Sequence, residues 1–153
     1  MKNEFIDKFG DKIHVCFNWK WFDSEDFKII AKEFLFIDQN NWFTPWYVDD
    51  NGSEVSWCYR DSKPLSIGDA INSQVIIRNK YDHIAKHKFN CDIYDIDIPM
   101  YFLGDNKYLL LDGNHRLMGL LLNGIKANVY GYVIYGPITE RMIPDLRHYQ
   151  VAI

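Results

Sequence analysis

Residues 96–135 constrain the fold more tightly than any other part of the chain. Two segments rich in β-branched, aromatic and aliphatic residues, 96–103 and 107–111, flank the turn residues Gly104-Asp105-Asn106. Apolar segments of this length on either side of a turn are typical of two antiparallel strands. The pattern therefore predicts a β-hairpin in this part of the chain.

A helix and a further strand are predicted to follow this hairpin. Asp112-Gly113 breaks the second strand, and a mainly apolar stretch then extends from about residue 115 to residue 122. Asn123-Gly124 supplies a helix stop, because glycine readily adopts the left-handed conformation that ends many helices. Residues 127–134 again favour a strand. Strands and a helix in this order indicate a domain that combines a sheet with packed helices.

The N-terminal half contains weaker patterns. β-Branched and aromatic residues predict a strand over 12–22. An i, i+3, i+4, i+7 apolar stripe over 27–34 predicts a helix that Asp23 or Ser24 caps and Gln39-Asn40-Asn41 ends. The Asn51-Gly52 pair predicts a hairpin over 42–60. Residues 66–85 begin with a Ser-x-x-Asp capping box and fit either one kinked helix or two helices.

Length and composition predict one globular domain. The chain has 153 residues, of which 48% are hydrophobic and 16% aromatic, enough to bury a sizeable core. No repeat, low-complexity segment or linker divides it. We therefore expect a single compact domain over 1–153 of the α+β (mixed α/β) class, with a small sheet and packed helices. Within it we distinguish an aromatic-rich N-terminal part, 1–65, and a unit over 96–135.

Charge and cysteine content exclude several classes of protein. The net charge is −4 and no run of Lys or Arg is present, so duplex DNA is disfavoured as a partner. No Cys-x-x-Cys pair exists, so neither a disulfide framework nor a zinc knuckle is expected, and Cys16 and Cys58 should be inert core thiols. Residues 1–5 lack the apolar run of a signal peptide, and residues 117–122 are too few to cross a bilayer. We expect a cytoplasmic protein without membrane contact.

Candidate binding chemistry concentrates in Asp112-Gly113-Asn114-His115-Arg116, hereafter the 112–116 turn. The chain leaves an apolar strand here and immediately starts a helix, so the first N–H groups of that helix have no intrahelical partners. Gly113 lets the backbone adopt a positive φ and approach a ligand closely. Together with the helix dipole, these N–H groups suit a phosphate, sulfate or carboxylate.

Each side chain of the turn can add to such a site. Arg116 can bind two phosphate oxygens at once, His115 can donate a hydrogen bond or move a proton near neutral pH, and Asn114 can donate and accept. Asp112 can orient Arg116, hold a metal-bound water or simply cap the helix. A purely structural turn is the alternative, but Arg in a first helical turn opposes the dipole at a cost of about 0.5 kcal/mol. An anion site is therefore the favoured interpretation.

With the elements around it, the 112–116 turn resembles the phosphate-binding loop of the ParB/sulfiredoxin superfamily. Members share a strand hairpin, a short Gly-x-x-Arg loop, a helix rich in Ala and Leu, and then a strand, which correspond here to residues 96–135. The resemblance implies a small α/β domain that cradles the phosphates of a nucleotide such as ATP or CTP, with magnesium as a further cofactor. The residues that it places against phosphate are Gly113, Asn114, His115 and Arg116.

Two departures narrow what the resemblance implies. Asn114 occupies the position at which sulfiredoxins carry a reactive cysteine, and without a thiol their sulfinic-phosphoryl chemistry has no nucleophile. The turn also lacks the Gly-Glu-Arg-Arg form common in partition proteins, and no helix-turn-helix region follows it. Neither sulfiredoxin activity nor plasmid partition is therefore expected.

Two further groups of residues carry weaker signals. His83 and His87 have the i, i+4 spacing that can place two imidazoles on one metal, but the Glu of the zinc hydrolase motif is missing, and we predict no metal site. Asp95 and Asp97 share one face of a predicted strand, where carboxylates are usually solvated. Asp97 precedes the 112–116 turn within the same unit and is the best-placed candidate for a general base.

The leading functional prediction is a protein that binds nucleotide phosphates at residues 113–116. Nucleotide hydrolysis or phosphoryl transfer would be further activities, with His115, Asp112 and Asp97 as the catalytic candidates. A ParB-like nuclease has the weakest support, because no basic groove is evident in the sequence.

A non-catalytic protein-binding module is the alternative from another class. Small size, acidic charge and the aromatic-rich 1–65 part favour a toxin-neutralising (immunity) or inhibitory protein that covers a partner's site. Its contact surface would include Trp42, Trp46 or Trp57. The same tryptophans fit cross-strand packing inside a hairpin, which is the favoured interpretation.

Overall fold

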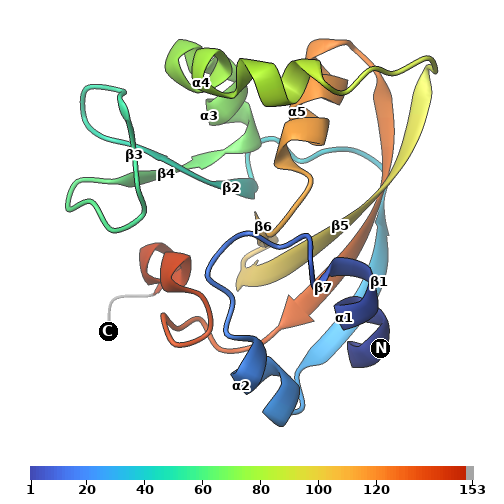
Figure 1. The fold of residues 1–153 in the computed structure, drawn as a ribbon, viewed down its shortest axis with the longest axis vertical. Helices are drawn as coiled ribbons and strands as arrows, with labels where there is room; N and C mark the ends of the chain where they lie inside the picture. Colours follow the sequence, from blue (N-terminus) through green and yellow to red (C-terminus); the bar gives the residue numbers. More distant parts are fainter. Residues whose placement is uncertain (151–153) are drawn as a thin grey trace.

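The strands form one seven-stranded mixed sheet with helices packed on both of its faces (Figure 1). The structure is a computed structural model that describes residues 1–150. The strands are β1 (Lys28–Phe34), β2 (Trp42–Val48), β3 (Glu54–Val55), β4 (Lys63–Ser66), β5 (Ile93–Gly104), β6 (Lys107–Leu110) and β7 (Lys126–Tyr135). The helices are α1 (Lys2–Phe9), α2 (Trp19–Ser24), α3 (Ile67–Asn72), α4 (Gln74–Ala85), α5 (Asn114–Leu122) and the 3-10 helix η1 (Pro144–Tyr149). The protein is a single compact α+β domain, as predicted.

Strand β5 lies at the centre of the sheet, whose order is β1-β7-β5-β6-β2-β3 with β4 paired to β2. It pairs in parallel with β7, from Ile93↔Lys126 to Tyr101↔Ile134, and antiparallel with β6. Parallel neighbours need a crossover connection, and α5 belongs to the one between β6 and β7. The N-terminus of α5 therefore lies just beyond the end of β6.

Two hydrophobic cores, one on each face of the sheet, hold these layers together. Side chains alternate along β5, so Ile98 joins the core beneath α5 while Tyr101 joins the core beneath α1 and α2. Leu117 and Leu120 anchor α5 to the first core, and a smaller cluster around Met118 joins α5 to α3 and α4. Because residues 117–120 of α5 are buried, its first turn is held in a fixed position.

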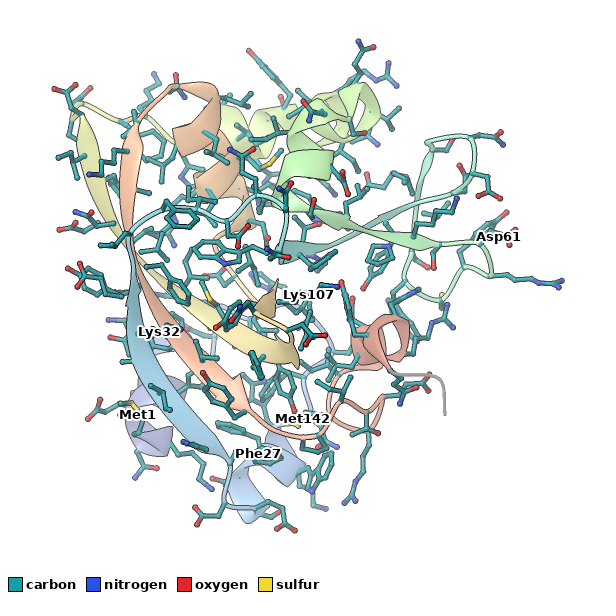
Figure 2. All side chains as sticks on the ribbon, turned by 180° about the vertical axis from the view of Figure 1, so that it is seen from behind. Met1, Phe27, Lys32, Asp61, Lys107 and Met142 are labelled. Atoms are coloured by element: carbon teal, nitrogen blue, oxygen red, sulfur yellow. The ribbon has the colours of Figure 1, made fainter. Side chains whose placement is uncertain are left out.

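A lobe made of β3, β4 and their connecting loop extends from the body of the domain (Figure 1). Asp61 lies near its tip, far from the centre of the sheet (Figure 2). The lobe is fastened to η1 through the Trp57 carbonyl oxygen, which accepts hydrogen bonds from Arg147 Nη2 at 2.7 Å and His148 Nε2 at 2.9 Å. These bonds hold Trp57 in a defined place relative to η1.

The predicted strand over 12–22 is wrong. Residues 12–18 have no regular structure, and α2 starts after Asn18, whose side-chain oxygen accepts a hydrogen bond from the Trp21 N–H at 3.0 Å. Phe17 and Phe22 are buried in the core beneath α1 and α2. The aromatic residues that suggested a strand instead cover the sheet.

The predicted helix over 27–34 is also wrong, because these residues form β1. An apolar stripe in so short a segment does not distinguish a helix from a strand, and Ile29 and Ile30 are β-branched. Antiparallel pairing with β7, from Lys28↔Tyr135 to Phe34↔Val129, decides between them. Tertiary contact overrode the local pattern here.

The other predicted elements are confirmed, with shifts of a few residues at their ends. The 42–60 hairpin exists as β2 and β3, and Gly52 in its turn has a φ of +78°. Ser66 caps α3 by accepting a hydrogen bond from the Asp69 N–H at 3.1 Å, and Ser73 then separates α3 from α4. Of the two alternatives for 66–85, two helices are therefore correct. No helix in residues 1–150 is long and apolar enough to cross a membrane.

Candidate functional site

The first turn of α5 has no side-chain cap. Gly113 is the N-cap residue with a φ of +84°, and Asp112, considered above as a cap, does not fill this role. Leu117 donates the first backbone bond of the helix, to the Gly113 carbonyl oxygen at 2.9 Å. The backbone N–H groups of residues 114–116 consequently have no partner within the helix. The helix start at the 112–116 turn is therefore open, with Gly113 at a positive φ as expected.

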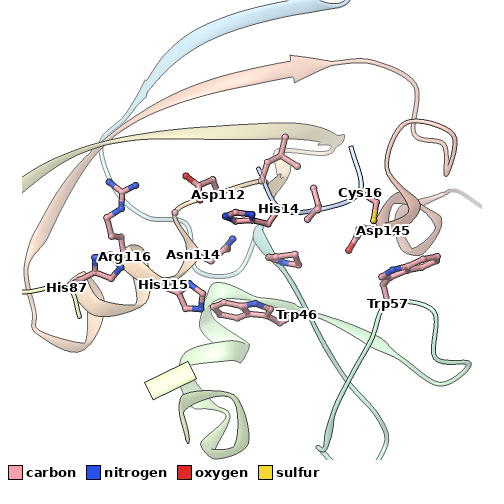
Figure 3. A pocket seen from close by; sticks show the side chains of 14 residues that line it. His14, Cys16, Trp46, Trp57, His87, Asp112, Asn114, His115, Arg116 and Asp145 are labelled. Carbon is pink, nitrogen blue, oxygen red and sulfur yellow. The ribbon is translucent and has the colours of Figure 1, made fainter. Parts of the chain in front are cut away.

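This turn opens on a cavity of about 460 Å³ (Figure 3). All five residues of the turn line the cavity. Leu111, next to the turn, also lines it, and the other walls come from distant segments: His14, Val15 and Cys16 before α2, Pro45 and Trp46 in β2, Trp57 in the lobe, His87 after α4, and Asp145 in η1. The fold therefore combines the predicted turn with side chains from five distant segments.

Asn114 lies almost fully inside the protein, at 6% exposure, and lines this cavity. Its Oδ1 atom is buried without a hydrogen-bond partner among the described residues. A buried acceptor left unpaired costs about 1–3 kcal/mol. A water or a ligand group that carries a donor would satisfy this oxygen.

His115 is held between two other rings. It stacks on His83 with ring centroids 5.0 Å apart and lies 5.1 Å from the Trp46 ring, and its Nε2 atom is buried without a partner in the described chain. Burial lowers the pKa of His115 to about 4, and neighbouring basic side chains add to the effect. The ring is therefore neutral at neutral pH, which suits hydrogen bonding better than proton transfer.

Arg116 supplies an unpaired cation on the cavity wall. It is half-buried, and no ion pair within residues 1–150 involves its guanidinium group. Asp112 also lines the cavity, but it makes no ion pair with Arg116. Burial, with help from the Arg116 charge, lowers the pKa of His87. The positive charge of Arg116 is thus left for a ligand.

Asp97 is separated from this group. It points to the α1 side of the sheet, where its Oδ2 atom pairs with Lys8 Nζ at 2.7 Å, and it is not among the cavity residues. Its neighbour Asp95 accepts a hydrogen bond from Asn128 at 3.0 Å on the surface. The structure therefore brings Asp112 and His115 together and leaves Asp97 apart.

The histidines noted in the sequence do reach one another. His83 contacts His115, and His87 lines the cavity beside Arg116. Within residues 1–150, however, no three His, Cys, Asp or Glu side chains converge as metal ligands would. The described chain alone offers no ready-made metal centre.

A buried carboxylate lies on the other side of the cavity and was not anticipated. Asp145 is 4% exposed and accepts a hydrogen bond from the Tyr47 hydroxyl at 2.5 Å. Burial raises the pKa of Asp145, and the Tyr47 hydrogen bond opposes that rise. No local sequence signal marks Asp145, because only the fold brings η1 against β2.

Cys16 and Cys58 are not core thiols, contrary to expectation. Both are exposed, because residues 12–18 form no strand and Cys58 lies in the lobe beyond the end of β3. Cys16 also lines the cavity, close to Asp145 in Figure 3. A thiol therefore borders the site without belonging to the 112–116 turn.

Comparison with known proteins assigns no family to this arrangement. No family model matches the chain, and neither a curated protein nor a solved structure does.

Proposed function

We propose that the protein binds a nucleotide through its phosphate at the 112–116 turn, as the ParB/sulfiredoxin resemblance implies. The observation that carries this proposal is the first turn of α5. It has no side-chain cap, its first N–H groups have no partner within the helix, and it faces the cavity. A helix start left open in this way is a ready site for an anion.

Charge at the turn supports a phosphate in particular. The unpaired Arg116 guanidinium and the free N–H groups of residues 114–116 present several donors to one volume. His87 lines the same part of the cavity and can donate as well. A phosphate has enough oxygens to accept from several of these groups at once.

The size and walls of the cavity support a nucleotide rather than an inorganic ion. A volume of about 460 Å³ lies within the range of small-molecule sites, whereas an inorganic anion would occupy a small part of it. Trp46 and Trp57 line the cavity, and tryptophan rings are good platforms for nucleobases. The proposed ligand therefore has an aromatic part as well as a phosphate.

Nucleotide hydrolysis or phosphoryl transfer is a further step that binding alone does not require. Asp112 and His115 are the candidates beside the proposed phosphate, and magnesium would be held by Asp112 together with phosphate oxygens. Asp97 would need a different arrangement to take part, because it pairs with Lys8 away from the cavity. We therefore propose nucleotide binding and do not include hydrolysis or phosphoryl transfer in the proposal.

Calorimetric titration of the full chain tests the proposal. ATP, CTP, GTP and ADP are added in turn, with and without magnesium, and at least one should bind. Arg116→Ala should weaken that binding about 10- to 100-fold, because hydrogen bonds to charged groups contribute about 1.5–3 kcal/mol. Arg78→Ala removes an exposed arginine of α4 and should leave the affinity unchanged. A wild-type protein that binds none of the four would overturn the proposal.

The alternative of a protein-binding module loses part of its support. Trp42 is 1% exposed and Trp46 is 8% exposed, so neither can form the exposed aromatic patch that motivated it. Trp57 is half-buried against Arg147. Of the three tryptophans, Trp57 alone is therefore partly available to a partner protein.

A further inference from the structure

The cavity has two chemically different ends. The helix end consists of the 112–116 turn, and the carboxylate end consists of Cys16, Trp57 and Asp145 (Figure 3). The two groups lie at opposite sides of the view, with His14 and Trp46 between them. A ligand whose phosphate occupies the helix end would therefore extend toward Asp145 and Trp57.

Asp145 is a built acceptor at its end of the cavity. Its carboxylate is held by the Tyr47 hydroxyl at 2.5 Å, and Tyr47 itself is 1% exposed. No ion pair in the described chain neutralises Asp145, although Arg147 lies nearby, because Arg147 donates to the Trp57 carbonyl instead. A backbone N–H and the charge of His148 also favour the ionised form, and N–H donors brought by a ligand would stabilise this buried carboxylate further.

Trp57 lies at the same end of the cavity, and its backbone is held in place. Its carbonyl oxygen accepts hydrogen bonds from Arg147, His148 and Ser62, at 2.7, 2.9 and 3.1 Å. The Arg147 guanidinium also lies 5.4 Å from the centre of the Trp57 ring. The Trp57 backbone is thus tied to η1, the short helix that carries Asp145, and the Arg147 contact also involves the ring.

The hydrogen-bonding edges of the bases differ in how they suit a carboxylate. Guanine presents two adjacent donors, N1–H and the N2 amino group. Adenine and cytosine present one amino group next to a ring nitrogen that accepts, and uracil places its N–H between two carbonyl oxygens. In adenine, cytosine and uracil, an acceptor atom would face one of the carboxylate oxygens and be repelled by it. Of these four bases, guanine alone can donate a hydrogen bond to both carboxylate oxygens.

We propose that the cavity is selective for guanine nucleotides, whose N1–H and N2–H groups donate to Asp145 while the base stacks on Trp57. This inference rests on the phosphate site proposed above. GMP is the simplest guanine nucleotide for the test, since it joins one phosphate to the base through a ribose.

Calorimetric titration with GMP, IMP, AMP and CMP tests this selectivity on the full chain. IMP differs from GMP only in lacking the N2 amino group. A hydrogen bond to a charged group contributes about 1.5–3 kcal/mol, so IMP should bind about 10- to 100-fold more weakly. AMP and CMP should bind more weakly still. Equal affinity for the four nucleotides would overturn the guanine inference and leave the phosphate site standing.

Asp145→Asn gives a sharper test, because it predicts a reversal rather than a loss. The amide keeps an oxygen that accepts from Tyr47, but it replaces the second oxygen with a donor. That donor repels the guanine amino group and matches the C2 carbonyl of xanthosine monophosphate. The ratio of the GMP affinity to the xanthosine monophosphate affinity should therefore fall by about 100-fold or more. Asp61→Asn, at the exposed lobe, should leave the ratio unchanged.

The outcomes separate the two proposals. If Asp145→Asn binds GMP and xanthosine monophosphate in the wild-type ratio, Asp145 does not read the base, and the guanine inference fails. If GMP binds but Arg116→Ala has no effect, the phosphate site fails while base recognition stands. If wild-type protein binds none of the nucleotides, both proposals fail.

Discussion

The two ends of the cavity are built in different ways. The helix end comes from one continuous stretch, 112–116, and most of its donors are backbone N–H groups set by the start of α5. The carboxylate end is assembled from Cys16, Trp57 and Asp145, which belong to three distant segments. The first end therefore depends on local geometry, and the second depends on packing between segments. Changes that disturb one should leave the other largely intact.

The largest effect should follow from breaking the buried pair at the carboxylate end. Tyr47→Phe removes the hydroxyl that donates to Asp145 at 2.5 Å and leaves a buried carboxylate short of a donor. Stability should fall by about 2–3 kcal/mol in urea unfolding, because hydrogen bonds to charged groups contribute more than neutral ones. The matched control is Tyr101→Phe, whose hydroxyl donates to the neutral Pro137 carbonyl at 2.8 Å and should cost about 1 kcal/mol. Equal losses would show that the Asp145 charge contributes nothing.

The helix end should be most sensitive at Gly113. Its φ of +84° is unfavourable for a residue with a Cβ atom, so Gly113→Ala should lower stability by about 1–2 kcal/mol. Gly52→Ala is the control, since Gly52 has a φ of +78° in the exposed hairpin turn. Both variants should unfold more easily, but only Gly113→Ala should weaken nucleotide binding. If Gly113→Ala bound the nucleotide normally, the 112–116 turn would not be the binding site.

Acid should act on the two ends with opposite signs. The pKa of His115 is about 4 in the folded protein and ordinarily 6.5. Between these values the unfolded chain binds a proton that the folded protein does not, so stability falls as the pH falls. Asp145 has a raised pKa, so the folded protein takes up a proton before the unfolded chain does, and stability rises as the pH falls toward the ordinary value of 3.8.

Unfolding curves between about pH 7 and pH 4 check both signs. Acidification from pH 7 to pH 4 should cost the wild type about 1 kcal/mol of unfolding free energy through His115, and His115→Gln should abolish this loss. The figure is small because solvent screens the half-exposed ring. Asp145→Asn should remove the stability that protonation of Asp145 adds at low pH. The stability of this variant should therefore fall more steeply with falling pH than that of the wild type. If stability depended on pH with the same slope in all three proteins, neither His115 nor Asp145 would cause the pH dependence described above.

The smallest change in stability should come from Cys16, where a labelling experiment is more informative. Cys16 is exposed and lines the cavity, whereas Cys91 is exposed outside it. Saturating GMP should slow the alkylation of Cys16 and leave Cys91 unaffected, as measured by mass spectrometry of the peptides. Cys16→Ser should change stability by less than about 0.5 kcal/mol. Equal protection of both thiols would argue against a ligand at the carboxylate end.

The elements that the sequence predicted correctly are those with local signals. The hairpin, the α5 helix and β7 follow from glycine turns and continuous apolar segments, and each lies close to its predicted position. Residues 12–34 were assigned wrongly because their structure is decided elsewhere: β1 exists through pairing with β7, and Phe17 and Phe22 pack beneath α1. The residue pattern of one short segment carries no information about partners that lie far away in the chain.

The candidate site divides in the same way. The 112–116 turn could be predicted, because a glycine, a helix start and an arginine are adjacent in the sequence. Asp145 could not, since its importance comes from Tyr47, which is distant in the chain. Trp57 was noted only as one of several aromatic residues, and its fixed position depends on Arg147.

The bonds between Trp57 and η1 have a consequence for folding during synthesis. Ribosomes release the chain from its N-terminus, so Arg147 and His148 emerge after every strand of the sheet. The sheet and the 112–116 turn can therefore form while Trp57 still lacks two of its hydrogen-bond donors. The carboxylate end therefore cannot be completed before every strand of the sheet has left the ribosome.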